Sequence, residues 1–249
     1  MNFNGNAQAA NLMFDFITSI NHSNNHSELM SKINSVATAF GFENFAISGI
    51  PLPNENIDPY VLLNGWPEEW FDRYVVEKYV HVDPVIYRAK TSDDAFIWSE
   101  VLESRPLNPK ARRLMNEASE FRMRDGFCVP LHLTGGFQAL VTFAGSGKID
   151  LSPELRGVLQ IIAIYAHNRI RLLLPTRKSH KTSSITNVTL HERDVIQWCA
   201  EGKTNWEIGV ILGRSEKTVQ HELHNAQRKL NCVNRAQLVA EAIRVGIIR

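Results

Sequence analysis

The chain has 249 residues, 44% of them hydrophobic, and only three cysteines. Cys128, Cys199 and Cys232 are far apart and form no C-x-x-C pair, which argues against a disulfide scaffold or a zinc site and indicates a reducing compartment. The net charge of +1 hides an asymmetry, because residues 176–249 hold 12 Lys and Arg against 7 Asp and Glu, whereas residues 1–175 hold 15 against 19. A basic tail on an acidic body is typical of an attached nucleic-acid-binding module, although an uneven solvated surface would give the same counts.

No stretch of the sequence has the pattern of a secretion signal or of a membrane span. The first residues lack a basic region followed by an apolar one. The apolar stretch at 155–174 is interrupted by Arg156, His167, Arg169 and Arg171, so it falls far short of the roughly 18–20 apolar residues that cross a bilayer. We therefore expect a soluble, cytoplasmic protein that has no membrane partner.

Residues 1–174 alternate between helical and strand patterns. Helices are expected at 9–20, at 27–40 with Ser27 as N-cap, at 67–79, from Pro84, at 109–121 and at 153–174. Strands are expected at 44–50 and 60–63, and a hairpin is expected where 127–133 and 137–143 flank Thr134-Gly135-Gly136. Strands with helices before, between and after them favour one antiparallel sheet between helical layers. The predicted fold class of this part is α+β, an α-β-α sandwich.

A change in composition separates this part from the rest of the chain. Residues 175–188, Pro-Thr-Arg-Lys-Ser-His-Lys-Thr-Ser-Ser-Ile-Thr-Asn-Val, are mostly polar, small or basic. That composition is typical of a semi-flexible linker. We expect two domains, at 1–174 and 189–249, joined by a linker at 175–188.

Capping boxes mark three helix starts in the C-terminal part. Thr189, Thr204 and Asn234 each stand three residues before a Glu or Gln, so the short side chain accepts from a helix amide while the longer one reaches back to the cap. Gly213-Arg214-Ser215 predicts a turn and a further N-cap, for a helix that runs to about Leu230. Four short helices result, and a tight turn joins the middle two. This all-α pattern is a helix-turn-helix, which predicts duplex DNA as the partner.

One face of the helix that follows Ser215 is expected to meet the DNA. Apolar residues recur at helical spacing and should face inward: Val219, Leu223, Ala226 and Leu230. The opposite face carries long cationic and amide side chains, which read base edges and grip phosphates: Lys217, Gln220, His221, His224 and Arg228. A merely solvated face is the alternative, and the capped turn favours DNA. His221 and His224 lack a nearby third ligand, so no metal site is expected.

A set of short motifs in this part points to a family. These are Glu192, Gly202-Lys203-Thr204-Asn205, Glu207-Ile208, Ser215-Glu216-Lys217-Thr218-Val219, Arg228-Lys229-Leu230, Asn234-Arg235 and Gly246-Ile247. In these motifs the chain resembles the DNA-binding domain of LuxR-type transcription regulators. With the resemblance, Thr204, Asn205 and Thr218 join the expected DNA contacts. Two positions depart from the family: Ile196, where Leu is favoured, and Glu222, where His is frequent and where an anion would repel phosphate if it pointed there.

Aromatic residues are concentrated in one segment of the N-terminal part. Of the 22 Phe, Tyr and Trp residues, nine lie between Tyr60 and Trp98. Trp70 and Tyr74 are four residues apart and share one helix face. Most of the nine are expected to fill the core beneath the sheet, and a few of them to line a ligand pocket.

The N-terminal part carries a second resemblance. Trp70-x-x-x-Tyr74, Asp83-Pro84, Trp98 within Phe96–Ser99, and Gly126 ahead of Val129-Pro130-Leu131 resemble the acyl-homoserine-lactone-binding domain of LuxR-type quorum-sensing receptors. The resemblance implies that the Trp70 indole donates to the lactone carbonyl, Asp83 accepts from the ligand amide and Tyr74 donates to the acyl carbonyl. Trp98 would pack against the lactone ring, and Thr142 would lie on the acyl side. Asp83-Pro84 is also typical of a helix N-cap followed by Pro at the first helical position, and both roles are compatible.

These patterns together predict a quorum-sensing transcription regulator. It would bind an N-acyl homoserine lactone without a further cofactor. The last N-terminal helix is apolar on more than one face, which predicts a homodimer that reads inverted-repeat promoter DNA. A regulator that folds without the lactone or answers another small molecule is the nearest alternative.

Two other classes of function are weighed against this one. Gly145-Ser-Gly-Lys148 lacks the first Gly and the final Ser or Thr of a phosphate loop, and no motif of nucleophilic or metal-dependent catalysis occurs, so an enzyme is not expected. A dimerisation partner that does not touch DNA is suggested only by Glu222.

Overall fold

The computed structural model describes residues 6–104, 106–133, 138–174 and 188–248. Apart from Leu133, the described residues up to Leu174 form one compact unit, and those from Val188 onward form a second. The predicted hairpin turn at 134–136 and the predicted linker, apart from Val188, lie outside the described residues. None of the helices in the described ranges combines the length and the apolar character needed to span a bilayer.

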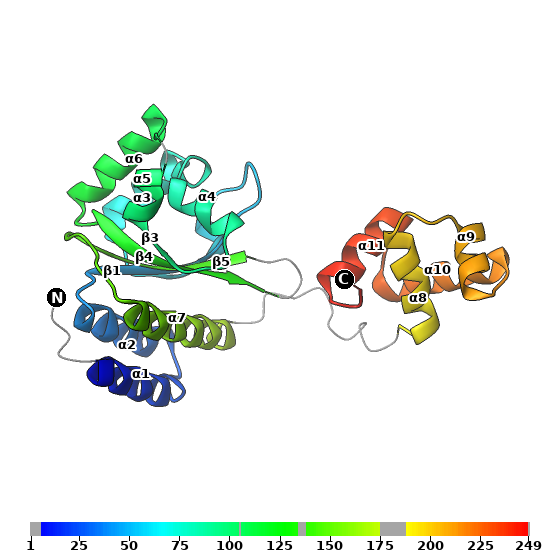
Figure 1. Ribbon diagram of the computed structural model, residues 1–249, viewed down its shortest axis with the longest axis horizontal. Coiled ribbons are helices and arrows are strands. Elements are labelled where there is room, and N and C mark those ends of the chain that lie inside the picture. The colour runs from blue at the N-terminus through cyan, green and yellow to red at the C-terminus, as the bar shows by residue number, and fades with distance from the viewer. Residues whose placement is uncertain (1–5, 105, 134–137, 175–187, 249) are drawn as a thin grey trace. The chain divides into compact units, whose positions relative to one another are not determined.

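The first unit is built on a five-stranded antiparallel sheet of order β2-β1-β5-β4-β3 (Figure 1). Its strands are β1 (Asn44–Gly49), β2 (Val61–Asn64), β3 (Phe96–Ile97), β4 (Asp125–His132) and β5 (Gln138–Gly145). The predicted pairing of the last two strands is confirmed over eight register positions. The short strand β3 was not predicted, because two residues are too few to show an alternating pattern.

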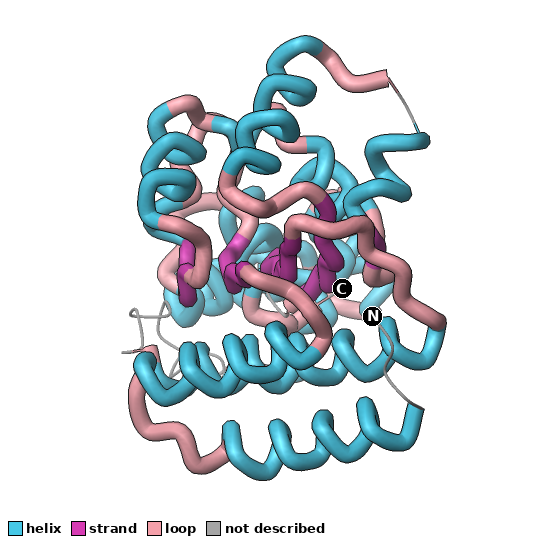
Figure 2. Tube along the Cα trace, turned by 90° about the vertical axis from the view of Figure 1, so that its left-hand side faces the viewer, coloured by secondary structure: helices cyan, strands magenta, loops and turns pink. Residues whose placement is uncertain are grey.

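Helices cover both faces of this sheet, as Figures 1 and 2 show. One layer contains α1 (Asn6–Ile20), α2 (His26–Ala39) and α7 (Pro153–Leu173). The other contains α3 (Glu68–Val76), α4 (Pro84–Thr91), α5 (Trp98–Ser104) and α6 (Pro109–Glu120), with the short 3-10 helices η1 (Asp58–Tyr60) and η2 (Tyr79–His81) in the connections. The predicted α-β-α sandwich is therefore confirmed.

The alternation of side chains along the central strands creates two cores. Phe127, Val141 and Phe143 belong to the core shared with α1, α2 and α7. Cys128 and Leu140 point to the other face and belong to the core beneath α3 to α6. Most of the clustered aromatic residues lie in this second core, where four of them line the candidate site.

Two local predictions in this unit need correction, and one helix was missed. Asn25, not Ser27, caps α2, because its side chain accepts from the amide of Glu28 at 2.9 Å while the Glu28 carboxylate accepts from Asn24. The helix predicted at 67–79 ends at Val76, since Lys78 has a left-handed φ of 52° that an α-helix cannot continue through. The helix α5, which starts at Trp98, was not predicted at all.

The second unit is a bundle of four helices: α8 (Leu190–Ala200), α9 (Asn205–Leu212), α10 (Glu216–Leu230) and α11 (Arg235–Arg244). The capping boxes at Thr189 and Thr204 are complete. The third is half formed, because Asn234 caps α11 but Gln237 accepts from Val233 rather than from the cap. The predicted inward row of α10 is confirmed, as its four residues lie in the core of the unit.

The turn between α9 and α10 is tight enough to exclude side chains. Gly213 ends α9 with a φ of 66°. A Cβ on Gly209 would lie 2.6 Å from the carbonyl oxygen of Arg214, so only glycine allows the turn to pack against α9. A side chain at Gly209 would therefore push the turn away from α9.

Candidate functional site

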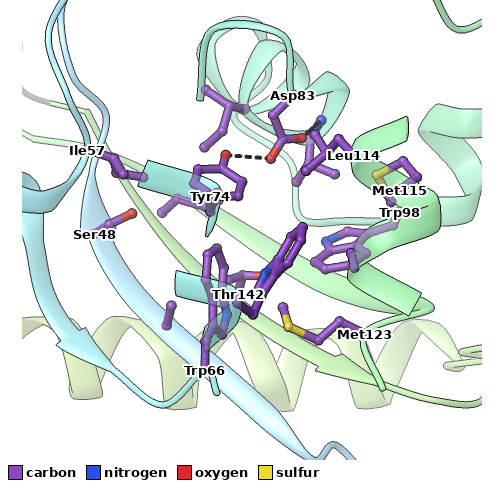
Figure 3. A pocket seen from close by; sticks show the side chains of 16 residues that line it. Ser48, Ile57, Trp66, Tyr74, Asp83, Trp98, Leu114, Met115, Met123 and Thr142 are labelled. Carbon is purple, nitrogen blue, oxygen red and sulfur yellow. Dashed lines mark hydrogen bonds between the residues drawn. The ribbon is translucent and has the colours of Figure 1, made fainter. Parts of the chain in front are cut away.

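A pocket lies in the second core, between the sheet and the layer of α3 to α6 (Figure 3). All five residues predicted to contact a ligand line it: Trp70, Tyr74, Asp83, Trp98 and Thr142. The other lining residues are Ala46, Ser48, Ile57, Trp66, Val85, Ile86, Leu114, Met115, Ala118, Met123 and Leu140. Eight of these eleven lie on β1, α4, α6 or β5, so contact prediction from sequence had no local signal for most of them.

Asp83 and Tyr74 form the polar centre of the pocket. The hydroxyl of Tyr74 donates to one Asp83 carboxylate oxygen at 2.7 Å, and the amide of Val85 donates to the other at 2.7 Å. Asp83 is thus the N-cap of α4, with Pro84 at the first helical position as predicted. Burial raises the pKa of Asp83, and the hydrogen bonds from Tyr74 and Val85 oppose that rise. Burial and the adjacent Asp83 raise the pKa of Tyr74 far above its ordinary value, so the phenol remains a donor.

Two indole nitrogens in the pocket lack hydrogen-bond partners. Nε1 of Trp66 and Nε1 of Trp70 are buried and have no acceptor among the described residues. A buried donor without an acceptor costs stability, roughly 1–3 kcal/mol, and is a ready site for a ligand carbonyl. Trp66 was not among the predicted site residues. It stands four residues before Trp70, but Pro67 and the helix start separate them, so no helical spacing marked it.

Trp98 contacts the sheet, and its indole N–H already has an acceptor there. Its Nε1 donates to the sulfur of Cys128 at 3.2 Å, and that thiol donates to the hydroxyl of Thr142 at 3.4 Å. Burial raises the pKa of Cys128 to about 12, so the thiol stays protonated. A Cβ on Gly126 would lie 2.6 Å from Cε2 of Trp98 and from the carbonyl oxygen of Phe143. The absence of a side chain at Gly126 therefore leaves room for the indole of Trp98 against β4.

A network of charges ties α6, one wall of the pocket, to α3 and η2. Glu117 accepts from the hydroxyl of Tyr79 at 3.0 Å and from Nε of Arg113 at 2.6 Å. Arg73 lies 3.6 Å from the same carboxylate, and its guanidinium stands 5.1 Å above the ring of Phe121. Burial of the carboxyl raises its pKa, but the hydrogen bonds from Arg113 and Tyr79 outweigh that effect and leave the pKa of Glu117 lowered.

The second unit presents a polar face on α10. All of the residues predicted there are exposed: Lys217, Thr218, Gln220, His221, His224 and Arg228. Asn225 orders two of them, because its amide donates to Nδ1 of His221 at 3.2 Å and its carbonyl accepts from Arg228 at 3.2 Å. Contact of these side chains with DNA stays a prediction.

The two residues predicted to contact DNA at the start of α9 have internal partners. Thr204 caps α9 and its hydroxyl donates to Glu207 at 2.8 Å. The side-chain carbonyl of Asn205 accepts from Arg235 at 2.9 Å, and Arg235 also donates to the carbonyl of Lys203. The Asn205–Arg235 contact therefore joins α9 to α11, whereas the Thr204 hydroxyl bonds within its own capping box.

Glu222, the acidic residue that departs from the family pattern, forms an ion pair with Arg214. Arg214 donates to both carboxylate oxygens of Glu222, at 3.0 and 3.2 Å, and the two side chains are only 20% and 15% exposed. Glu222 therefore does not present an unpaired charge on the flank of α10. Within the described ranges, no cluster of three or more His, Cys, Asp or Glu residues is arranged to hold a metal ion.

Two family models match the chain. Residues 25–170 match the autoinducer binding domain, and residues 186–242 match the bacterial regulatory proteins of the luxR family. The chain belongs to the LuxR family of autoinducer-binding regulators. Both predicted resemblances are thereby confirmed, and each match falls on one of the two candidate sites.

Curated members of the LuxR family resemble this chain over most of its length. The quorum sensing-dependent transcriptional regulator RpaR of Rhodopseudomonas palustris is 40% identical over 89% of this chain and 88% of its own. The transcriptional activator BjaR1 of Bradyrhizobium diazoefficiens is 37% identical over 94% of this chain and 95% of its own. In fold, this LuxR-family chain resembles SdiA of Escherichia coli in complex with octanoyl-rac-glycerol, with a TM-score of 0.66 at 21% identity over 100% of this chain and 99% of that one.

Proposed function

We propose that this LuxR-family chain binds an N-acyl homoserine lactone in the pocket of its first unit and regulates transcription by binding DNA through α10. The observation that carries the proposal is the set of polar groups in one apolar pocket. Asp83 supplies a carboxylate, and Trp66 and Trp70 supply two buried donors without partners. The ligand has one amide donor and several carbonyl acceptors, which these groups complement.

The proposed contacts follow the chemistry of each group. The amide N–H of the ligand donates to Asp83, the indole of Trp70 donates to the lactone carbonyl, and Tyr74 donates to the acyl carbonyl. Trp66 adds a second donor for the acyl carbonyl. The lactone ring packs on the open face of Trp98, and Thr142 lies beside the acyl group. A hydrogen bond to a charged group contributes roughly 1.5–3 kcal/mol, so Asp83 is the largest single polar contribution.

The size of the pocket suggests that ligand binding is coupled to movement of its walls. The cavity volume is ≈ 40 Å³, enough for a few water molecules and too small for an acylated lactone. The wall from α6 contains Met115, and Met123 follows it, both flexible side chains that can move aside. A ligand that wedges this core open and fills it would stabilise the unit by about 2.7 kcal/mol at a hundredfold excess over its Kd.

The proposal includes a homodimer on inverted-repeat DNA. The outer face of α7 exposes Ile161, Tyr165 and Leu172, which recur at helical spacing opposite the residues that α7 buries against the sheet. A second copy covering this face would remove the apolar side chains from water. Two α10 helices related by a twofold axis would read half-sites about one helical turn apart, or a multiple of it.

Thermal melting with a panel of ligands tests the sensing function. The purified protein is melted alone and with lactones of increasing acyl length, and with octanoylglycerol as the competing chemistry. A rise in Tm with at least one lactone is expected. Stabilisation by octanoylglycerol alone would instead support the alternative, a LuxR-type regulator that answers another molecule, and no stabilisation by either would support an orphan regulator.

Gel shifts test the DNA-binding function. The protein is expected to bind inverted-repeat promoter fragments, with an affinity that falls steeply as salt rises, because phosphate contacts release counterions. Sedimentation of the complex should give two copies per site. A protein that dimerises but shifts no DNA at low salt would be a regulatory partner instead. The Arg214–Glu222 ion pair argues against a partner that does not touch DNA, because Arg214 neutralises Glu222, the only residue that suggested such a partner.

A further inference from the structure

We infer that a second cavity, the groove between the start of α4 and the start of α6, is an outer site where the acyl homoserine lactone first binds and through which it enters and leaves the buried pocket. This inference rests on the proposed function, since it concerns the same ligand. It gives a binding role to residues outside the sequence motifs, His81 and Leu107 among them.

The buried pocket needs such a route. Trp70, Tyr74 and Trp98, three of its proposed ligand contacts, are each no more than 5% exposed. A ligand in solution therefore reaches them only after part of the pocket wall has moved aside. The place where the wall is thinnest and borders an open cavity is the natural place for that movement.

The groove is larger than the pocket and open to solvent. Its volume is ≈ 310 Å³, against ≈ 40 Å³ for the pocket. Polar and apolar side chains both line it: His81, Tyr87 and Asn108, which are exposed, together with Val82, Pro84 and Leu107. An acyl homoserine lactone has a polar head and an apolar tail, so the groove offers both kinds of surface that the ligand requires.

The wall between the two cavities is the first turn of α4. Asp83 is the one residue in the described part of the chain that lines both of them. The residues after it divide between the cavities, since Pro84 and Tyr87 line the groove whereas Val85 and Ile86 line the pocket. Figure 3 shows Asp83 at the upper edge of the pocket. A ligand in the groove is thus one helical turn away from the carboxylate that is proposed to hold its amide.

One face of α6 runs past both cavities. Ala111 lines the groove, and Leu114, Met115 and Ala118 line the pocket. These positions follow each other at i, i+3, i+4 and i+7, so they share one side of the helix. A ligand that moves along this face passes from the groove to the pocket without crossing α6. Met115 is flexible and the two alanines are small, so this face offers little steric resistance.

The contacts of the two helices favour an opening between them. α4 packs mainly against α5 and β4. Glu117 fastens the second half of α6, because it accepts from Tyr79 of η2 and lies 3.6 Å from Arg73 of α3. The groove lies at the other end of α6, at its first turn. Movement of that turn away from α4 would open the wall and leave the Glu117 contacts in place.

Binding rates test the inference, because an entry route controls association and dissociation but not the bound state. His81, exposed at the groove, is replaced by Cys and labelled with a bulky methanethiosulfonate that dithiothreitol removes. Stopped-flow fluorescence of the tryptophans in the pocket follows lactone binding to the full chain and its release. The label should slow both rates equally, by about tenfold, which is within the range that association rates span among variants of one site. Kd should stay unchanged, and dithiothreitol should restore both rates.

Three controls carry the same label. Labelled wild type accounts for the half-buried native Cys232. Thr91→Cys places the label at an exposed position of α4 outside the groove, where it should leave both rates unchanged. Leu52→Cys places it on the exposed connection between β1 and β2, a competing route because that connection also brings Ile57 to the pocket.

Four outcomes would overturn the inference. Unchanged rates in labelled His81→Cys would exclude the groove as the route. Slowing of equal size by the label at Thr91 or Leu52 would assign the effect to labelling in general or to the competing route. A higher Kd through faster dissociation alone would make the groove part of the final binding site. Failure of the wild type to bind any lactone would remove the proposed function together with the inference, whereas the first three results leave lactone binding intact.

Discussion

The hydroxyl of Tyr74 lies 2.7 Å from the carboxylate of Asp83, a bond that joins α3 to the first turn of α4. Because Val85 occupies the second carboxylate oxygen, Asp83 is oriented from two sides before any ligand is present. Orientation in advance lowers the entropy that binding must otherwise remove. The residue that caps a helix is thus also placed to receive the ligand amide.

Replacing Asp83 with Asn should weaken ligand binding about tenfold or more, because the contact of the amide with a charged acceptor is lost. The C-terminal unit should stay folded, and its DNA binding should be unchanged in gel shifts without ligand. Calorimetry measures the affinity, and Asp94→Asn, an exposed aspartate on the same unit, is the control for the charge change. Full sensitivity of Asp83→Asn to the lactone would rule out this contact.

Ligand affinity should depend on pH through the same carboxyl group. Burial raises the pKa of Asp83 above the 3.8 of an ordinary aspartate, against the effect of its hydrogen bonds. The folded protein therefore keeps this proton up to a higher pH than the unfolded chain does. The protonated carboxyl stabilises the ligand-free protein below pH 3.8, and this stabilisation is lost as pH rises from 3.8 through the raised pKa. The ligand amide needs the ionised form, so affinity should rise with pH over that window. Calorimetry across this pH window should give an affinity of Asp83→Asn for the ligand that does not change with pH. Equal slopes of affinity against pH in the wild type and in Asp83→Asn would assign the pH dependence to another group.

Gly126→Ala should disable the pocket without replacing any of the residues proposed to contact the ligand. Its Cβ would lie 2.6 Å from the Trp98 ring and from a backbone oxygen of Phe143, so the indole must move from its place on β4. Overpacking of this kind costs about 1–3 kcal/mol, and the moved ring should also weaken lactone binding. Thermal melting with and without ligand measures both effects. Gly157→Ala is the matched control, because its Cβ meets no atom within 4 Å and should leave both unchanged or raise Tm slightly. A wild-type ligand response in Gly126→Ala would show that the position of Trp98 is unimportant.

The sequence predicts the parts of this fold that depend on neighbours in the chain. Capping residues, glycines and prolines mark most helix boundaries because their effects are local, and alternating residues mark the central hairpin. Even a local pattern fails where two caps compete, as Asn25 and Ser27 do, since the partner Glu28 decides between them.

The pocket depends on contacts between distant residues and is harder to predict. The roles of the five predicted residues came from the family resemblance, and helical spacing had placed only Trp70 and Tyr74 together. Ser48 has the appearance of an ordinary strand residue, and only the fold places its hydroxyl in the pocket. Glu117 contacts Tyr79 across 38 positions of sequence, a pairing that only the packing of α6 reveals.

Removing a cation from the exposed face of α10 should weaken DNA binding in a salt-dependent way. Lys217→Ala and Arg228→Ala should each lower the slope of log affinity against log salt by about one, as expected for one lost phosphate contact. Stabilisation by ligand should be unaffected. Lys110→Ala makes the same charge change on the exposed start of α6 and serves as the control. If Lys217→Ala, Arg228→Ala and Lys110→Ala weaken DNA binding equally, the change in net charge explains the effect and not the loss of a phosphate contact.

The ion pair inside the second unit should set its resistance to acid. Nζ of Lys229 lies 2.8 Å from both oxygens of Glu192, whose residue is only 4% exposed, so Lys229→Met leaves a buried carboxylate without its cation. The free energy of unfolding of this unit should fall by about 1–3 kcal/mol, less than for a fully buried pair because the lysine is partly exposed. Adding Glu192→Gln should recover part of the loss, since the amide oxygen can still accept from Thr189. Hydrogen exchange of peptides from α8 and α10 in the full chain measures these changes.

The same pair determines the direction of the pH effect. Burial raises the pKa of Glu192, but the hydrogen bonds from Lys229 and Thr189 outweigh it and leave the pKa below 4.5. A depressed pKa contributes stability above the unfolded value, and that contribution is lost as pH falls below 4.5 through the folded pKa. Hydrogen exchange in α8 and α10 should therefore accelerate in that acid range in the wild type. The double variant Lys229→Met with Glu192→Gln should show no such acceleration from this site. If its hydrogen exchange accelerates in acid as much as that of the wild type, other carboxylates control the stability of the unit.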